Sequence, residues 1–277
     1  MAIDRKVIVV TGASSGIGNA IATLLAKRGF RVLGTCRNPD THPKKADEFF
    51  DLVAMDVTQD ASVTTAFKSI LEDEHRIDAL ICCAGSGIAG SVEETSIEEA
   101  KAQFEVNYFG TLRSIKAVLP HFRAAGAGRI VVVSSIAGLI GLPFQSFYSS
   151  TKFALEGFVE GLRLEVRPFG IAVSLVEPGD FRTGFTASRT MAAAYLSAGT
   201  ASPYFSMHEA VLGQQAKDEQ AGHDPLEAAR LVERLILAGH PAVRYSTGPR
   251  FQRFAAKLKA FLPSRVFESL LGMIYHL

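Results

Sequence analysis

Short apolar runs alternate with longer segments of helical period along this chain of 277 residues. The apolar runs predict strands at 6–12, 30–38, 51–58, 77–85, 128–138, 170–179 and 242–248. The periodic segments predict helices at 19–29, 60–74, 97–124 and 148–168, and from Pro225 onward. Strands that alternate with helices pair in parallel through right-handed crossovers, and continuously apolar strands are covered on both faces. The order therefore predicts an α/β fold, a doubly wound, mostly parallel seven-stranded sheet with helices on both faces.

The pattern weakens after Gly184, and no linker divides the chain into independent domains. Residues 185–225 contain no strand-like run and only loose helical character, so we expect a long insertion that forms a helical substrate lid. Residues 250–277 are basic and rich in apolar side chains, which indicates a C-terminal helical extension. We interpret residues 1–277 as one domain with these two additions.

Composition argues against several classes of protein. The 29 lysines and arginines balance 28 aspartates and glutamates, which gives no electrostatic case for a nucleic-acid partner. The three cysteines show no paired framework, which favours a reducing, cytoplasmic compartment, and the seven histidines lack zinc-like spacing, so we expect no metal site. The N-terminus lacks the apolar region of a secretory signal, and no run of about 18 apolar residues predicts a membrane span.

The stretch TGASSGIG, residues 11–18, lies between the first strand and the first helix. Glycines there let the backbone approach a pyrophosphate, and the helix N-terminus offers free N–H groups and a favourable dipole. This context predicts a Rossmann-type dinucleotide site, with a tight turn that only needs small residues as the alternative. The residues expected to hold the cofactor are Gly12, Ser14, Ser15, Gly16, Ile17 and Gly18.

The end of the second strand bears on the choice of cofactor. It reads Thr35-Cys36-Arg37-Asn38 and has no carboxylate to accept hydrogen bonds from a ribose 2′-OH. Arginine pairs well with a phosphate, so Arg37 favours NADP(H). A solvated surface arginine is the alternative interpretation.

Polar side chains gather where the fifth strand ends and the next helix begins. Ser134 and Ser135 end that strand at the carboxyl edge of the sheet, where doubly wound folds bind ligands. Tyr148 and Lys152 lie four residues apart and share one face of the helix. With the glycine loop, these residues resemble the short-chain dehydrogenase/reductase family over about residues 5–185. Further matches are Asp56-Val57, Cys83-Ala84-Gly85, Asn107 in FEVNYFG and PGDFRT at 178–183.

The resemblance implies a catalytic set of four residues. Tyr148 would donate a proton to the carbonyl oxygen during reduction, and Ser135 would hydrogen-bond the same oxygen. Lys152 would bind the nicotinamide ribose and lower the pKa of Tyr148. Asn107 would organise a water-linked proton relay to that lysine.

The resemblance also implies further cofactor contacts. Asp56 and Val57 would border the adenine, Ala84 and Gly85 would lie near the cofactor ribose, and a later loop would hold the carboxamide end. The residues of that loop are Pro178, Gly179, Phe181 and Thr183. The family usually has asparagine where this chain has Cys83, which puts a strand-stabilising amide in doubt. We expect Ser134 to be structural.

A narrower resemblance, carried by GLIGLPFQSFY and KFALEGF, is to the 17β-hydroxysteroid dehydrogenase type 1 and retinol dehydrogenase-like branch. It implies that Leu142, Phe144 and Phe185 line an apolar pocket, together with the aromatic lid, and that the substrate is a lipophilic alcohol or ketone. Packing of the lid onto the core or onto another subunit is the alternative for each of these residues.

Two parts of the chain, the C-terminal tail and a group of aromatic residues on two helices, are expected to contact other molecules or other parts of the protein. The C-terminal tail could cover the pocket, contact another subunit or lie on a membrane, the last being the weakest of the three interpretations. Five aromatic residues suit the helix-pair interface of a homodimer or homotetramer: Phe104, Tyr108, Phe109, Phe153 and Phe158.

The sequence thus predicts an NADP(H)-dependent oxidoreductase that interconverts a ketone or aldehyde and an alcohol. One alternative is a 3-oxoacyl reductase of the same family. A non-catalytic NADP-binding regulator is another, but it would be expected to lack a member of the serine–tyrosine–lysine set, and all three are present.

Overall fold

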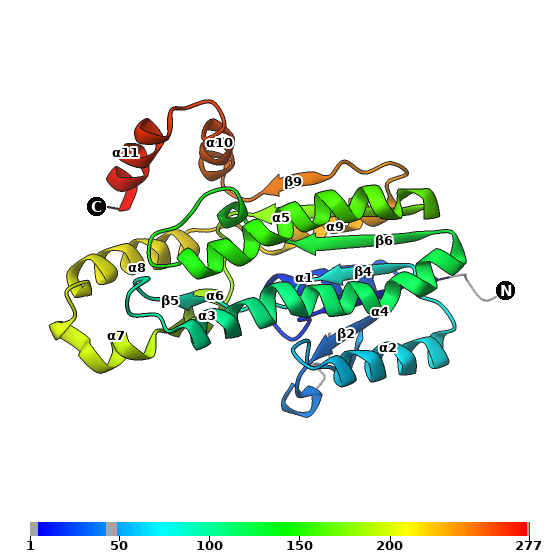
Figure 1. The fold of residues 1–277 in the computed structure, drawn as a ribbon. Helices are drawn as coiled ribbons and strands as arrows, with labels where there is room; N and C mark the ends of the chain where they lie inside the picture. The colour runs from blue at the N-terminus through cyan, green and yellow to red at the C-terminus, as the bar shows by residue number, and fades with distance from the viewer. Residues whose placement is uncertain (1–4, 43–48, 276) are drawn as a thin grey trace.

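A seven-stranded parallel sheet forms the centre of the molecule (Figure 1). The computed structural model describes residues 5–42, 49–275 and 277. The strand order is β3-β2-β1-β4-β6-β7-β9, and all neighbouring pairs are parallel. The strands are β1 (Val7–Thr11), β2 (Arg31–Cys36), β3 (Asp51–Ala54), β4 (Ala79–Cys82), β6 (Gly128–Val133), β7 (Ile171–Pro178) and β9 (Arg244–Thr247). The predicted doubly wound sheet is therefore confirmed.

Helices cover both faces of the sheet. On one face the core includes apolar residues of α2 (Asp60–Glu74), α4 (Gly110–Ala125) and α5 (Ser146–Val166). On the other face it includes residues of α1 (Gly16–Lys27) and α9 (Leu226–Leu237). Both layers pack on strands that are mainly apolar, with Ser174 and Glu177 as polar residues inside β7.

One predicted helix is divided in two. The segment 97–124 forms α3 (Ile97–Phe104) and α4, joined by a π-helical turn over Glu105–Phe109. Ser96 and Glu99 form a capping box at the start of α3, and Gly126, with φ of 64°, ends α4. Single π turns of this kind often lie at functional sites.

The insertion contains more regular structure than the sequence predicts. It forms α6 (Phe185–Ser188), β8 (Thr190–Met191), α7 (Ala193–Ala198) and the 16-residue α8 (Phe205–Gln220). The expected absence of a strand is wrong, because β8 pairs with β5 (Ile88–Ala89), a second strand that was not predicted. Two-residue strands are too short to produce an alternating pattern, and the apolar residues of α8 form no clear stripe along the helix.

The C-terminal extension folds as α10 (Arg250–Leu258) and α11 (Ser264–Tyr275), at the same end of the molecule as α8. Ala256 and Phe267 pack with Ile140 and Leu142, which follow β6. Within the described residues, no helix is long and apolar enough to cross a bilayer.

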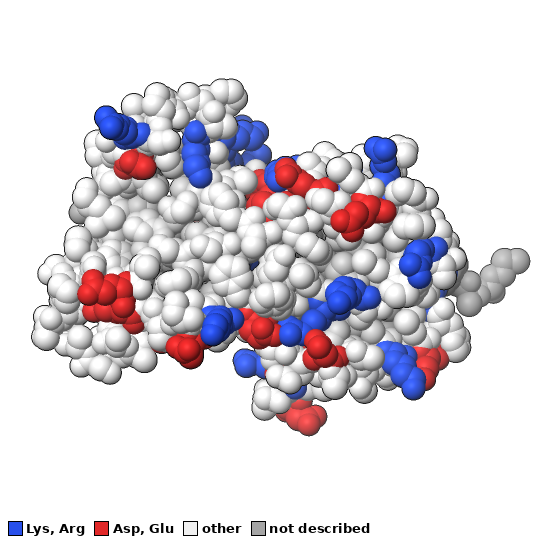
Figure 2. Space-filling model, viewed as in Figure 1, with Lys and Arg blue, Asp and Glu red and all other residues white. Residues whose placement is uncertain are grey.

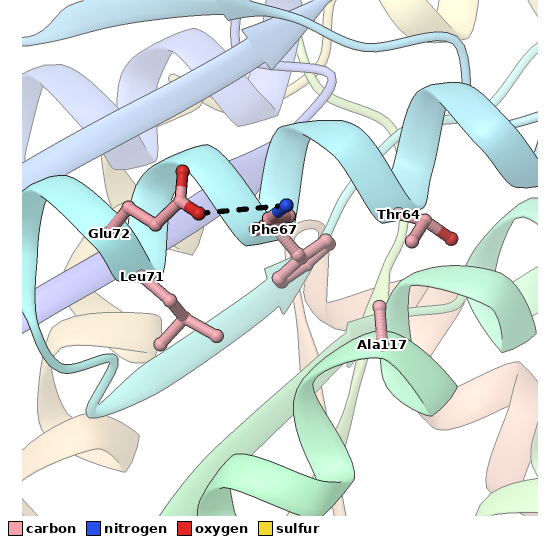
Figure 3. Close-up of a pocket in the computed structure, with 6 residues that line it drawn as sticks. Thr64, Phe67, Leu71, Glu72 and Ala117 are labelled. Atoms are coloured by element: carbon pink, nitrogen blue, oxygen red, sulfur yellow. Dashed lines mark ion pairs between the residues drawn. The ribbon is translucent and has the colours of Figure 1, made fainter.

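A shallow hollow of about 400 Å³ opens between α2 and α4 (Figure 3). Its lining includes Phe67, Leu71 and Ala117, and the Lys68 ammonium lies 3.7 Å from the Glu72 carboxylate at its rim. None of the predicted site residues lines it, so it is not part of the candidate site.

Candidate active site

The predicted site residues lie mainly in loops at the carboxyl ends of the strands. The chain order reverses between β1 and β4, which are neighbours in the sheet. A crevice at such a reversal is the usual ligand site of doubly wound sheets. The loops after β1, β4, β6 and β7 carry the glycine loop, Gly85, Ser135 and the segment 178–183, respectively.

The glycine loop has the backbone of a phosphate cradle. Gly12 and Gly16 have φ of 68° and 56°, values that side-chain-bearing residues rarely adopt. A Cβ on Gly12 would lie 2.7 Å from the Cα of Ala84, and one on Gly18 would lie 2.3 Å from the Gly12 carbonyl oxygen. The exposed Ser15 begins α1 without a side-chain cap, so the helix N-terminus is available to an anion. These features fit a dinucleotide pyrophosphate.

The other glycine-loop residues have different surroundings. Ser14 is half-buried, and Ile17 packs against the core on the α1 side of the sheet. A Cβ on Gly16 would lie 3.7 Å from the Cβ of Thr183, so the loops after β1 and β7 face each other closely. The Thr183 hydroxyl donates to a Glu219 carboxylate oxygen at 2.9 Å, which ties the cofactor loop to α8.

The adenine side of the crevice follows β2 and β3. Arg37 lies directly after β2, is exposed, and forms no ion pair with any described residue. The Asp56 carboxylate accepts hydrogen bonds from the Thr58 N–H and hydroxyl at 2.9 and 2.8 Å, which fixes the turn after β3. Val57 is buried, and a Cβ on Gly110 would lie 2.7 Å from one of its methyl groups.

Thr11 stabilises the loop in which Cys83 replaces the asparagine usual in the family. Its hydroxyl oxygen accepts hydrogen bonds from the Cys83 and Ala84 N–H groups at 3.0 and 3.1 Å. Burial raises the pKa of Cys83 to about 12, so it remains a neutral thiol. The loop is thus held by β1 without a side-chain amide at this position.

Ser135, Tyr148 and Lys152 converge beside this loop. Ser135 caps a short 3₁₀ turn by accepting a hydrogen bond from the Ala137 N–H at 3.1 Å, and its hydroxyl lies 3.4 Å from the Pro178 carbonyl oxygen. The Lys152 ammonium lies 5.7 Å from the centre of the Tyr148 ring. It donates to the Val133 carbonyl at 3.0 Å, which fixes it beneath the crevice.

Burial dominates the electrostatics of this group. It raises the pKa of Tyr148 to about 12, and the neighbouring Ser135 hydroxyl acts in the opposite direction. It lowers the pKa of Lys152 to about 8. Burial therefore moves the Tyr148 pKa in the direction opposite to the lowering by Lys152 that the resemblance implies.

Asn107 lies in the π-helical turn and is fully buried. Its carboxamide accepts from the Ser86 N–H at 2.8 Å and donates to the Ser86 carbonyl and the Thr151 hydroxyl at 3.0 and 3.1 Å. A Cβ on Gly85 would lie 3.3 Å from the Asn107 amide oxygen and 3.9 Å from the Lys152 ammonium. The structure thus brings Gly85, Asn107 and Lys152 together. Ser134, by contrast, is buried close to Gly138, away from this group's hydrogen bonds.

The three predicted substrate residues have different surroundings. The Phe185 ring lies 5.4 Å from the Tyr148 ring. Phe144, whose φ is 58°, faces the lid, with its ring 5.1 Å from that of His208. Leu142 packs with the C-terminal extension. Of the three, Phe185 is the one in ring contact with the predicted proton donor.

Sequence reasoning missed a buried polar cluster under the lid. Gln145, Arg189 and Gln215 are all less than 10% exposed. The Gln215 amide oxygen accepts from the Gln145 amide and, at 2.9 Å, from the Arg189 guanidinium, whose Nε has no partner among the described residues. Gln145 directly precedes α5, so the cluster connects the lid to the helix that carries Tyr148. No periodic pattern marks these residues.

Asp180 and Gln252 form a second unpredicted link. The Gln252 amide oxygen accepts from the Asp180 N–H at 2.9 Å, and its amide nitrogen donates to the Asp180 carboxylate. Burial raises the pKa of Asp180 to about 6, and the hydrogen bond from Gln252 partly opposes this. Phe181, predicted to touch the cofactor, has a buried side chain that packs against Gly248 and His223. Asp180 belongs to PGDFRT, but its partner lies 72 residues further on.

Comparisons with known proteins agree with this geometry. The sequence profile described as short chain dehydrogenase matches residues 6–193. A 3-ketodihydrosphingosine reductase from Bacteroides thetaiotaomicron is 38% identical over 99% of both chains. The human 17-beta-hydroxysteroid dehydrogenase type 1 is 31% identical over 89% of this chain and 79% of that protein.

A solved structure shows the same architecture. A short-chain dehydrogenase from Streptomyces avermitilis matches with a TM-score of 0.81 and 31% identity over 94% of each chain. Fold, motif order and relatives that match most of the chain therefore agree. The chain belongs to the short-chain dehydrogenase/reductase family of oxidoreductases, which act on alcohols and carbonyl compounds with a nicotinamide cofactor.

Proposed function

We propose that the chain is an NADP(H)-dependent oxidoreductase that interconverts a lipophilic ketone or aldehyde and the corresponding alcohol. The observation that carries the proposal is the convergence of Ser135, Tyr148 and Lys152 beside a glycine cradle. A regulator without catalytic activity would have no need of this group.

The choice of NADP(H) rests on Arg37. This guanidinium lies after β2, exposed and without an acidic partner among the described residues, where it can pair with a 2′-phosphate. No carboxylate follows β2 in the described turn Arg37–Asn38 to accept from a 2′-OH instead. Gly12, Gly16, Gly18 and Thr183 would hold the remainder of the dinucleotide, which supplies the hydride when bound.

The residues of the chain supply the proton and the stabilisation of charge. Tyr148 donates its phenolic proton to the carbonyl oxygen as that oxygen gains negative charge, and Ser135 holds the oxygen by a hydrogen bond. Lys152, with a pKa of about 8, exchanges protons readily near neutral pH. Asn107 holds the Ser86 backbone beside Lys152 in place, and it would organise a water-linked proton relay to that lysine.

A lipophilic substrate is supported by the lining of the site. Phe185 lies against Tyr148, and Phe144 faces the aromatic inner side of the lid. Apolar and aromatic walls with few polar groups are typical of pockets for bulky hydrophobic ligands. Two relatives are named for large hydrophobic substrates, 3-ketodihydrosphingosine and a 17-beta-hydroxysteroid.

Replacement of Tyr148 by phenylalanine tests the proposal. The change removes one hydroxyl and keeps the ring contact with Phe185, so we expect kcat for any accepted ketone to fall by about 10²–10⁴-fold while NADPH affinity changes little. Turnover is measured by NADPH absorbance with a panel of steroids, retinoids and acyl ketones. Tyr245→Phe is the matched control, because Tyr245 lies on β9 and its hydroxyl accepts a hydrogen bond from the Ala242 N–H. Full turnover by Tyr148→Phe would exclude Tyr148 as the proton donor.

A further inference from the structure

The C-terminal extension has one buried side and one exposed side. On the buried side, Ala256 and Phe267 pack with residues that follow β6, and Tyr275 is 9% exposed. The Lys259 ammonium donates to the Leu139 carbonyl at 2.7 Å and lies 4.9 Å from the centre of the Phe153 ring. These contacts fix the orientation of α10 and α11 relative to the catalytic domain.

The exposed side is unusually apolar. Of the 18 exposed large hydrophobic residues described, eight belong to the last 27 positions of the chain. Phe251, Phe254 and Phe261 are 66%, 62% and 84% exposed, and Met273 is 64% exposed. We call the eight the tail face: Phe251, Phe254, Phe261, Val266, Leu270, Met273, Ile274 and Leu277. An apolar surface of this kind on an otherwise well-packed protein indicates a binding partner.

The charge around the tail face is positive. Arg250, Lys257 and Arg265 are exposed, and Glu268 is the single acidic residue of α10 and α11. None of these basic side chains forms an ion pair with a described residue. The whole chain carries a formal charge of only +1, so this positive charge is local. Figure 2 shows blue side chains and a red patch over α10 and α11, with white, uncharged surface between the blue groups.

We propose that the tail face binds the surface of an anionic lipid bilayer. Phenyl and aliphatic side chains would enter the boundary between headgroups and acyl chains, while Arg250, Lys257 and Arg265 pair with lipid phosphates. Helices α10 and α11 lie in the membrane plane and do not span it. The two helices together present both features that such binding requires, apolar area and positive charge.

A second copy of the chain fits this surface less well. A twofold-symmetric contact places the same patch of both copies face to face. The basic residues around the tail face of one copy would then meet those of the other, and like charges in an interface are unfavourable. An anionic surface has the complementary charge.

The tail face lies close to the candidate active site. Gln252 on α10 binds the Gly179–Asp180 loop, and Leu142 packs with the buried side of the extension. A bilayer on the tail face would therefore lie beside the substrate lid, where a lipid-soluble substrate could enter. Binding to lipid does not require the proposed reaction, so the two proposals can fail separately.

Vesicle flotation of the full chain tests the proposal. The vesicles contain phosphatidylcholine alone or with one third phosphatidylglycerol, at salt of about 0.1 M and again at about 0.5 M. We expect the protein to bind the anionic vesicles about tenfold more strongly than the neutral ones, and less strongly at the higher salt. Absence of binding to anionic vesicles overturns the proposal.

Two triple variants distinguish binding by the tail face from non-specific binding by exposed apolar residues elsewhere on the protein. Phe251→Ser, Phe254→Ser and Phe261→Ser together should reduce vesicle binding about tenfold or more. The control replaces three exposed apolar residues elsewhere, which should leave binding unchanged: Phe49→Ser, Leu164→Ser and Phe169→Ser. Thermal unfolding confirms that both variants are folded. Equal losses in both variants, or a tail variant that only converts a dimer to a monomer, would show that the face binds no lipid.

Discussion

The link between Gln252 and Asp180 predicts that a residue outside the family's shared core controls cofactor binding. Gln252 accepts from the Asp180 N–H and donates to the Asp180 carboxylate, and a Cβ on Gly179 would lie 2.4 Å from its amide oxygen. Gln252→Ala removes both hydrogen bonds and leaves a gap against a loop that is expected to hold the carboxamide end of the cofactor.

The magnitude follows from the two bonds. A neutral hydrogen bond contributes about 0.5–1.5 kcal/mol and one to a charged group about 1.5–3 kcal/mol, so the pair contributes about 2–4.5 kcal/mol. Asp180 is only partly buried, and water can replace part of what is lost. We therefore expect Gln252→Ala to lose about 1–2 kcal/mol of the free energy that orders the loop. The cofactor must then order the loop itself, which corresponds to about a 5–30-fold weaker affinity for NADPH.

Fluorescence titration of NADPH measures this affinity without turnover. Gln214→Ala is the matched control, because Gln214 donates a hydrogen bond to Asp218 one turn later on α8 and forms no hydrogen bond with the cofactor loop among the described residues. We expect the control to bind NADPH as the unmodified chain does. Equal affinities of Gln252→Ala and Gln214→Ala would refute the reasoning, since the loop would then be ordered without Gln252.

Two further predictions concern charge. Arg37→Asp should lower the preference for NADPH over NADH about 10–100-fold, because a phosphate partner is replaced by a like charge; steady-state kcat/KM values with both cofactors measure it, and an unchanged ratio contradicts the assignment. The pKa of Asp180 is raised from 3.8 to about 6, so its protonated form is favoured in the folded state and its contribution to stability is lost as the pH rises through about 6. The free energy of unfolding of Asp180→Asn, relative to the unmodified chain, should therefore rise by up to about 3 kcal/mol between about pH 4 and 6.5, measured by urea unfolding. Parallel pH profiles of the two proteins would show that Asp180 does not titrate in this range.

The parts of the fold that the sequence predicts well are those fixed by local patterns. Strands β6 and β7 are mainly apolar because helices cover both faces of the sheet, and their ends place Ser135 and Pro178 at one edge. The glycine loop is recognisable because the backbone geometry of Gly12 and Gly16 permits few other residues. Local sequence patterns therefore predict much of the site without any knowledge of tertiary contacts.

The remaining contacts depend on segments far apart in the chain. Arg189 and Gln215 meet because β8 pairs with β5 and folds the insertion back over the site, and neither short strand leaves a pattern in the sequence. The pKa of Tyr148 could not be predicted for the same reason, since its sign depends on how completely the lid and the neighbouring loops exclude water. A motif identifies the proton donor but not its environment.

The position of the C-terminus has a practical consequence for work on this protein. Strand β1 starts at the amino edge of the sheet, whereas α11 ends beside α8 at the opposite end of the molecule (Figure 1). An affinity tag fused after Leu277 would therefore emerge next to Tyr275 and the substrate lid, and could change substrate access or vesicle binding without any mutation. Kinetic constants measured with a tag at that end should be compared with those of a chain tagged at the other end before they are assigned to the enzyme.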